Sequence, residues 1–251
     1  MNYETYQTII YVWMGIGLAT SILLLKITAP YGRHTSAHWG PLINNNLGWV
    51  LMEAPVIIAL MYFVLNNVQN QNAVTWFLLG TFMFHYINRI FIFPFRLRTQ
   101  RKKMPLIIVA SAIGFNLVNG FLLGYYFAHY ADYSPNYFLQ PNFIIGILFF
   151  ITGVFINWES DSILINLRKP GESGYVIPQG WLFDYISCPN FFGEIIEWAG
   201  FALMCWNLPA VSFLVWTCAN LIPRALSHHK WYKQNFEFYP RQRKAILPWL
   251  I

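Results

Sequence analysis

Charged residues are scarce in this chain: only 10% of its 251 residues are Asp, Glu, Lys or Arg, against roughly 25% in soluble domains. Cysteine is also scarce. Cys188, Cys205 and Cys218 show neither a CxxC spacing nor a disulfide framework. The chain lacks a GxGxxG turn, a P-loop, an HExxH helix and a GxSxG elbow. These absences argue against a disulfide-rich domain, a Rossmann or P-loop nucleotide site and a metal site. A dinucleotide would need a site built from helix ends.

Hydrophobic residues, by contrast, make up 57% of the chain and come in long runs. Seven runs come near the ~20 residues that a helix needs to cross a bilayer. The first run lacks a basic n-region and a small-residue cleavage site, so it is interpreted as a span rather than a signal peptide. The sequence predicts an all-α, polytopic membrane protein, a bundle of seven transmembrane helices forming a single domain over residues 1–251. The expected spans are Tyr6 to Thr28, Leu47 to Leu65, Ala73 to Phe93, Pro105 to Tyr130, Asn142 to Ile165, Phe191 to Trp206, and Leu208 to Ala225.

Lysine and arginine occupy alternate connecting segments. The segment around residues 96–103 holds five of them, and the tail after residue 229 holds another five. The N-terminus and the segments after the second, fourth and sixth runs hold none. The positive-inside rule then places the N-terminus outside and the C-terminus in the cytosol. The net charge of +6 is explained mostly by anionic lipid headgroups, without nucleic acid.

Ionisable residues inside spans are costly and are functional candidates by default. Glu53 lies one to two turns into the second run; the alternative is a carboxyl paired with an arginine elsewhere in the bundle. Polar stripes at helical spacing mark the cytosolic ends of four other runs. One stripe alone would fit a packing network, and Arg89 alone would fit a snorkelling anchor. Together they predict one polar pocket open to the cytosol. The stripes are Tyr86, Arg89 and Phe93; Asn157, Asp161 and Arg168; Asn190, Glu194, Glu197 and Trp198; and Arg224, His228 and Tyr232.

Several motifs occur in an order that resembles the membrane steroid 5α-reductase family, the 3-oxo-5α-steroid 4-dehydrogenases. They include the stretch 157–171 with Leu-Arg-Lys-Pro-Gly, the stretch 190–198 with Asn-Phe-x-Gly-Glu-Ile-Ile-Glu-Trp, and a C-terminal Arg-Lys-Ala at 243–245. The resemblance begins near Ala29 and covers nearly all of the chain after it. It implies reduction of the Δ4 double bond of 3-oxo steroids with NADPH, and it assigns most of the cofactor site to residues 142–251.

The resemblance also implies roles for individual residues. Glu53 and Tyr86 match the catalytic pair that faces the 3-keto group, where both would donate hydrogen bonds to the developing enolate. Burial in apolar surroundings would keep the Glu53 carboxyl protonated. Tyr86, directly or through water, is one candidate for the proton donor, which the sequence leaves open. The cofactor-binding positions are Tyr31, Arg89, Asn157, Asp161, Arg168, Asn190, Glu194, Trp198, Arg224, His228 and Tyr232.

The chain departs from the mammalian pattern at a few positions. Met52 stands where those enzymes carry glutamine, which removes a polar partner for Glu53. Ser111 and Val176 stand where they carry arginine, so the phosphate contacts must differ. Phe93 replaces a tyrosine, and Ser227 replaces a histidine. The reaction class is less affected by these changes than the identity of the substrate.

Three other functions fit parts of the sequence. An enoyl-thioester reductase uses the same hydride chemistry. A membrane methyltransferase would bind S-adenosylmethionine at the last helix ends, but Cys188-Pro189 replaces the usual His-Pro there. A seven-helix transporter or receptor would need a polar path from the outside. We expect a steroid or another lipid-soluble enone as substrate, membrane lipids as surroundings, no nucleic acid, and a monomer. The expected location is a bacterial inner membrane or the endoplasmic reticulum.

Overall fold

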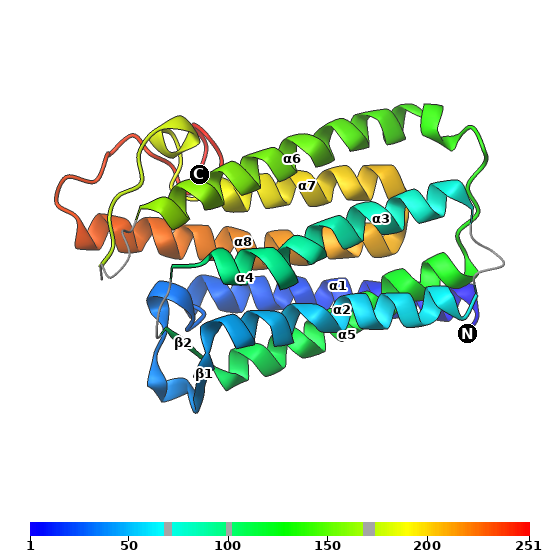
Figure 1. Ribbon diagram of the computed structural model, residues 1–251, viewed down its shortest axis with the longest axis horizontal. Coiled ribbons are helices and arrows are strands. Elements are labelled where there is room, and N and C mark those ends of the chain that lie inside the picture. Colours follow the sequence, from blue (N-terminus) through cyan, green and yellow to red (C-terminus); the bar gives the residue numbers. More distant parts are fainter. Residues whose placement is uncertain (68–71, 99–101, 168–173) are drawn as a thin grey trace. The chain divides into compact units, whose positions relative to one another are not determined.

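The computed structural model describes residues 1–67, 72–98, 102–167 and 174–251, and most of these residues are helical (Figure 1). Arg168, one of the expected cofactor residues, lies outside the described residues. Two short strands, β1 (Leu42–Asn44) and β2 (Lys103–Pro105), depart from the all-α prediction. The α-helices are α1 (Tyr3–Lys26), α2 (Asn45–Leu65), α3 (Ala73–Ile87), α4 (Phe93–Arg96), α5 (Leu106–His129), α6 (Pro141–Asn166), α7 (Pro189–Cys205) and α8 (Leu208–Asn235).

Six helices in the described part of the chain are long and apolar enough to cross a membrane. They are α1, α2, the continuous stretch 73–96, α5, α6 and α8. This finding confirms a polytopic membrane protein. At 17 residues, α7 is not among them, so the seven-span topology and its orientation stay predictions. The last helix extends to Asn235, beyond the end of the expected span at Ala225, and includes the polar stripe that was expected at helical spacing.

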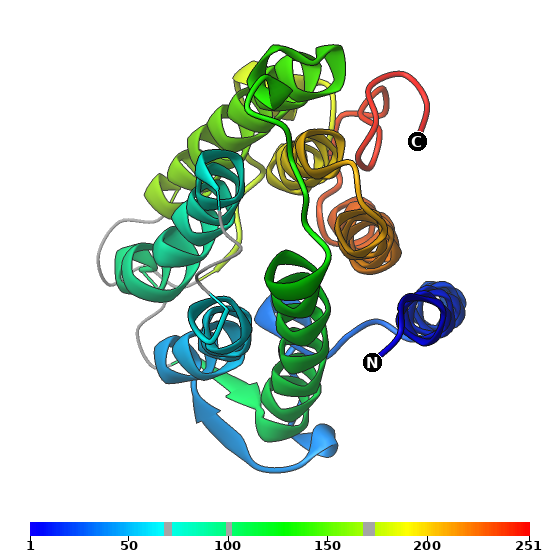
Figure 2. The ribbon, with the colours of Figure 1, turned by 90° about the vertical axis from the view of Figure 1, so that its right-hand side faces the viewer.

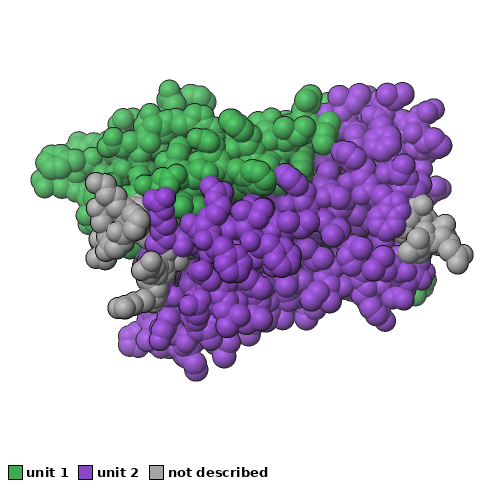
Figure 3. All heavy atoms as spheres, viewed as in Figure 1, with its two compact units in different colours: residues 1–29, 145–203, 211–251 green, residues 30–144, 204–210 purple. Residues whose placement is uncertain are grey.

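The chain forms two compact units, coloured separately in Figure 3. Unit 1 comprises residues 1–29, 145–203 and 211–251, and unit 2 comprises residues 30–144 and 204–210. Each unit is described by itself below.

Within unit 2, α2 and α5 pack closely along their lengths. The antiparallel pairing of β1 with β2, in which Leu42 lies opposite Pro105, joins the segments just before the two helices. Both helices therefore begin at the same end of the unit and run in the same direction (Figures 1 and 2). A β-carbon built on Gly120 would lie 2.6 Å from the carbonyl oxygen of Val56. The glycine therefore permits this close approach.

The third span changes helical type near its end. A π-helical turn, Asn88–Ile92, joins α3 to α4, and the N–H of Phe93 donates to the carbonyl of Asn88. Pro94 follows directly, and because proline has no N–H it cannot continue the ordinary ladder of helical hydrogen bonds. Such π turns occur frequently at functional sites. The turn carries Arg89.

Within unit 1, α6 and α7 approach each other through glycines. β-carbons built on Gly153 and Gly200 would overlap the backbone nitrogens of Glu197 and Phe150, respectively. One built on Gly193 would lie 2.5 Å from the backbone nitrogen of Asn157. This contact brings the polar ends of α6 and α7 together. In the same unit, the indole of Trp216 on α8 donates to the carbonyl of Trp13 on α1, at 3.0 Å.

Candidate functional site

A cluster of amides and a carboxylate lies where α6 meets α7 in unit 1. The side-chain amide of Asn157 donates to the carbonyl of Asn190 at 3.0 Å. The side-chain amide of Asn190 donates in turn to Oδ1 of Asp161 at 3.1 Å. Asn157 and Asp161 are one turn apart on α6, and only 1% and 5% of their surfaces are exposed. The structure therefore brings three of the expected cofactor residues into direct contact.

Phe191, next to Asn190, connects this cluster with α8. Its ring stacks on the imidazole of His228, with the centroids 5.7 Å apart and the planes at 26°. The guanidinium carbon of Arg224 lies over the same ring, 6.0 Å from its centroid. Arg224 and His228 are one turn apart on α8, so both face the start of α7. The sequence does not single out Phe191 as a site residue, although it directly follows Asn190 in the motif.

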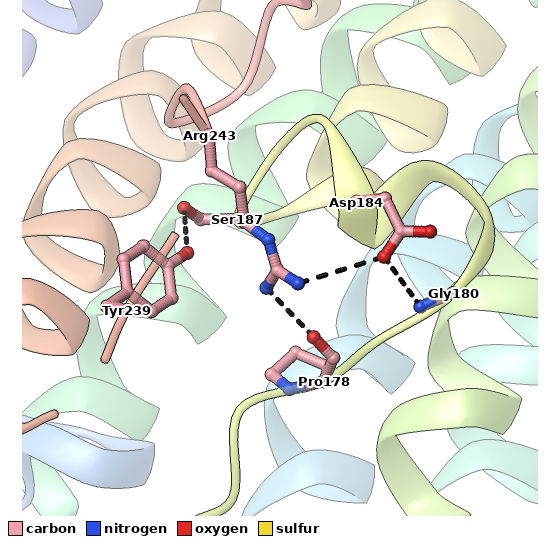
Figure 4. A network of polar contacts seen from close by, with 6 residues as sticks. All are labelled: Pro178, Gly180, Asp184, Ser187, Tyr239 and Arg243. Carbon is pink, nitrogen blue, oxygen red and sulfur yellow. Dashed lines mark hydrogen bonds and ion pairs between the residues drawn. The ribbon is translucent and has the colours of Figure 1, made fainter. Parts of the chain in front are cut away.

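The C-terminal tail holds the segment that leads into α7, and Figure 4 shows one of the contacts, between Ser187 and Tyr239. Lys244 and Ile186 form a parallel bridge. The hydroxyl of Ser187 contacts the phenol of Tyr239 and Nδ1 of His229, each at 2.6 Å. Burial raises the pKa of the Tyr239 phenol. Tyr232, another expected cofactor residue, is 2% exposed and stacks flat on Tyr239, with the planes at 7°.

Arg243 fixes the loop before this segment (Figure 4). Its guanidinium is buried and donates to the carbonyl of Pro178 at 2.8 Å. A second nitrogen lies 3.8 Å from Oδ1 of Asp184, the oxygen that accepts from the backbone N–H of Gly180. Gly180 adopts a φ of 84°, which glycine tolerates without strain. The tail therefore orders the turn at residues 178–184 and, through it, the start of α7.

Two further expected cofactor residues lie on α7. Glu194 is half-buried. Trp198 is 1% exposed, and its ring lies 4.5 Å from that of Phe213 and 5.6 Å from that of Phe201. The structure gives Trp198 an aromatic packing role within unit 1. Its expected place beside the nicotinamide stays a prediction.

Unit 2 holds the remaining candidates. The guanidinium of Arg89 lies between two rings, 4.8 Å from the centroid of Trp49 and 4.5 Å from that of Phe93. Trp49 on α2 was not among the predicted residues. Tyr86 is 4% exposed and packs against the ring of Phe82 at 4.9 Å. Tyr31 is half-buried and precedes a short 3₁₀ helix, Gly32–His34.

Glu53, on α2, has a partner on α5 that the sequence analysis missed. The side-chain amide of Asn116 donates to the backbone carbonyl of Met52 at 2.5 Å and to Oε2 of Glu53 at 3.5 Å. Asn116 is 3% exposed. A buried asparagine within an apolar span was the signal that could have found it.

The family model for 3-oxo-5-alpha-steroid 4-dehydrogenase matches residues 102–251. Steroid 5-alpha-reductase DET2 of Solanum lycopersicum is 41% identical over 250 residues, which cover 98% of this chain and 96% of that protein. DET2 of Gossypium hirsutum is 40% identical, covering 94% and 93%. The 3-oxo-5-alpha-steroid 4-dehydrogenase 1 of Homo sapiens is 38% identical, covering 96% and 93%. This chain therefore belongs to the 3-oxo-5-alpha-steroid 4-dehydrogenase family.

Proposed function

We propose that this protein reduces the Δ4 double bond of 3-oxo steroids to give 5α-dihydro-3-oxo steroids, with NADPH as the reductant. The names of its relatives support the reaction. The observation that carries the cofactor assignment is the cluster of buried Asn157 and Asp161 with half-buried Asn190, next to the Phe191 ring that Arg224 covers. A buried carboxylate and three amide or guanidinium groups in one place suit a large polar ligand with both donors and acceptors.

The residues of unit 1 fit a nicotinamide dinucleotide. Oδ1 of Asn157 is buried and has no hydrogen-bond partner among the described residues. Leaving such an acceptor unpaired costs about 1–3 kcal/mol, so a ligand N–H there would be stabilising. The Arg224 guanidinium suits a phosphate. When bound, NADPH would supply a hydride to the β-carbon of the enone. Asn190, Glu194, His228 and Tyr232 would complete the site in unit 1. Tyr31 and Arg89 remain proposed cofactor residues on the resemblance to the family alone.

Glu53 and Tyr86 are proposed to act on the substrate. As the C5 atom of the steroid gains a hydride, negative charge develops on the 3-oxygen. A neutral Glu53 carboxyl and the Tyr86 phenol would each donate a hydrogen bond to that oxygen and stabilise the enolate. The enolate then takes a proton at C4, and ketonisation restores the 3-keto group. Tyr86 is the proposed donor of that proton, directly or through water.

We also propose the finer topology that the charge pattern predicts. Seven spans, with α7 as the short sixth one, would place the N-terminus outside and the C-terminus in the cytosol, where the basic segments lie. NADPH would then enter from the cytosol, and the steroid from the bilayer. A monomeric, single-domain enzyme is sufficient for this scheme.

Separate assays of binding and turnover test these assignments. Glu53→Gln and Tyr86→Phe should each lower kcat, by about 100-fold for the loss of one donor to an oxyanion. Neither should change the Kd for NADPH, measured by nicotinamide fluorescence in detergent. Asp161→Leu should instead weaken NADPH binding, because it removes the acceptor that holds Asn190. Loss of NADPH binding in Glu53→Gln, or unchanged binding in Asp161→Leu, would contradict the division of roles.

A further inference from the structure

One face of α5 lies directly on the backbone of α2. Asn116, Gly120 and Gly124 recur every four residues and therefore share that face. β-carbons built on the two glycines would lie 2.6 Å from the carbonyl of Val56 and 2.8 Å from that of Leu60. Asn116 meets the carbonyl of Met52, one turn earlier on α2. Three contacts, each one turn from the next, therefore fix the register between the helices. Two of them are made by glycines, and the third is made by the amide of Asn116.

The orientation of the Asn116 amide follows from this register. The Met52 carbonyl can only accept a hydrogen bond, so the group 2.5 Å from it must be the NH₂ rather than the amide oxygen. An NH₂ group has two hydrogens. The second one is available to Oε2 of Glu53, 3.5 Å from the same nitrogen. Oδ1 of Asn116 points elsewhere; it is buried and has no hydrogen-bond partner among the described residues.

An amide N–H directed at one oxygen makes the two oxygens of a carboxyl group unequal. A neutral carboxyl has one carbonyl oxygen, which accepts, and one hydroxyl, which donates. The N–H of Asn116 favours Oε2 as the carbonyl oxygen, because a carbonyl oxygen accepts this hydrogen bond better than a hydroxyl oxygen does. The proton of Glu53 then resides on Oε1.

We propose that Asn116 is a positioning residue that fixes the proton of Glu53 on Oε1. This inference rests on the proposed function, in which that proton is donated to the 3-oxygen of the steroid. Asn116 itself touches neither substrate nor cofactor in this account. Its effect is to present the donor in one orientation before the substrate arrives, so the hydrogen bond forms without rearranging the carboxyl.

Two measurements on Asn116→Leu test the inference. Infrared difference spectra between each protein and its Glu53→Gln counterpart isolate the C=O stretching band of the Glu53 carboxyl. Loss of the Asn116 N–H should shift that band to higher frequency. In steady-state kinetics, kcat should fall about tenfold or more, the expected size for one lost buried hydrogen bond of this kind. The Kd for NADPH should stay unchanged.

Asn119→Leu is the matched control. Asn119 is a buried amide on the same helix, and its NH₂ donates to the carbonyl of Phe115 on its own helix. It should leave the frequency of the Glu53 band unchanged. Asn116→Ala provides a second variant if the larger side chain prevents folding. An unshifted band in both Asn116 variants, or an equal shift in Asn119→Leu, would overturn the inference, and so would a wild-type spectrum without a protonated Glu53 band at neutral pH.

The two readouts separate the inference from the function on which it rests. The infrared band requires no substrate, so it reports on Asn116 and Glu53 even if steroids are not reduced. A shifted band with no steroid reduction by the wild-type protein would support the pairing and overturn the proposed substrate. Steroid reduction with an unshifted band would leave the proposed function intact and overturn the role of Asn116.

Discussion

Gly153 of α6 lies against the backbone nitrogen of Glu197 of α7, so close that a β-carbon on Gly153 would overlap it. Two glycines of α7 make the same kind of contact with α6: Gly193 lies against Asn157, and Gly200 lies against Phe150. This spacing allows Asn190 to bond with both Asn157 and Asp161. The proposed cofactor site in unit 1 therefore depends on residues that have no side chain.

Gly153→Ala should accordingly separate the two helices. An added methyl group in a close-packed contact costs typically 1–3 kcal/mol in unfolding free energy, and more where only backbone faces it. The affinity for NADPH should fall with the stability. Thermal unfolding in detergent and NADPH fluorescence measure the two effects.

Gly114→Ala on α5 is the control, since a β-carbon there would meet no atom of the described residues within 4 Å. It should be neutral or stabilise the protein by about 0.4–1 kcal/mol, because alanine restricts the unfolded chain. Equal effects of the two substitutions would contradict the account of α6 and α7.

Arg243→Met should destabilise the tail and the turn that it fixes. The substitution removes the buried guanidinium that donates to the carbonyl of Pro178, and this carbonyl is left unpaired. We expect a cost of about 1.5–3 kcal/mol, the usual value for hydrogen bonds to charged groups. The ion pair with Asp184 adds little, because that carboxylate is 54% exposed. Limited proteolysis near residues 178–184 and thermal unfolding are the measurements.

Arg241→Met makes the same chemical change two residues away, at an exposed side chain. It should change the unfolding free energy by no more than about 0.5 kcal/mol. If Arg241→Met were as harmful as Arg243→Met, net charge rather than the Pro178 contact would explain both results.

Tyr239 should give the stability a defined dependence on alkaline pH. Burial raises its pKa above the ordinary value of 10.0, so the native state favours the neutral phenol. The stability that this preference contributes is fully present below pH 10.0 and is lost as pH rises toward the higher native pKa. The difference in unfolding free energy between the wild type and Tyr239→Phe should therefore be constant below pH 10.0 and shrink above it. A difference that stays constant on both sides would refute this assignment.

Met52→Gln is expected to destabilise the protein and leave Glu53 without a new partner. The side chain of Met52 is 5% exposed and packs in an apolar cluster with Met104 and Val109. A glutamine amide buried there without a hydrogen bond would cost about 1–3 kcal/mol. Met52→Leu keeps the volume and should cost less than about 1.5 kcal/mol. Unfolding of the three proteins in detergent gives the comparison, and a Met52→Gln protein as stable as wild type would show that the amide finds a partner.

Run length and periodicity were sufficient for much of the fold. The second span was expected to end at Leu65 and does, and the third was expected to begin at Ala73 and does. Apolar residues dominate these helices, so their extent follows from composition. The strands β1 and β2 were missed because each has only three residues and forms by pairing with a distant segment. The π turn at Asn88–Ile92 was missed for a similar reason, since helical spacing assumes an ordinary ladder.

The geometry of the candidate site was predictable where its residues lie on a single helix. Asn157 and Asp161 share a face of α6 because they are four residues apart, and the same holds for Arg224 and His228 on α8. Contacts between helices were not predictable. The bond from Asn116 to Glu53 depends on the register of α5 on α2, which Gly120 and Gly124 determine through backbone contact. The contact of Arg89 with Trp49 likewise depends on how α2 meets the π turn.

Isotope transfer tests the central claim most directly. The purified protein in detergent would receive a Δ4-3-oxo steroid and NADPH carrying deuterium at C4 of the nicotinamide, with the two C4 epimers tested separately. The account predicts a 5α-dihydro-3-oxo product with deuterium at C5 from one of the two epimers, and formation of this product about 100-fold more slowly in Glu53→Gln. Absence of C5-labelled steroid from both epimers would contradict it. In parallel reactions, label entering an added enoyl-thioester, or methyl transfer from added S-adenosylmethionine, would favour the alternative functions.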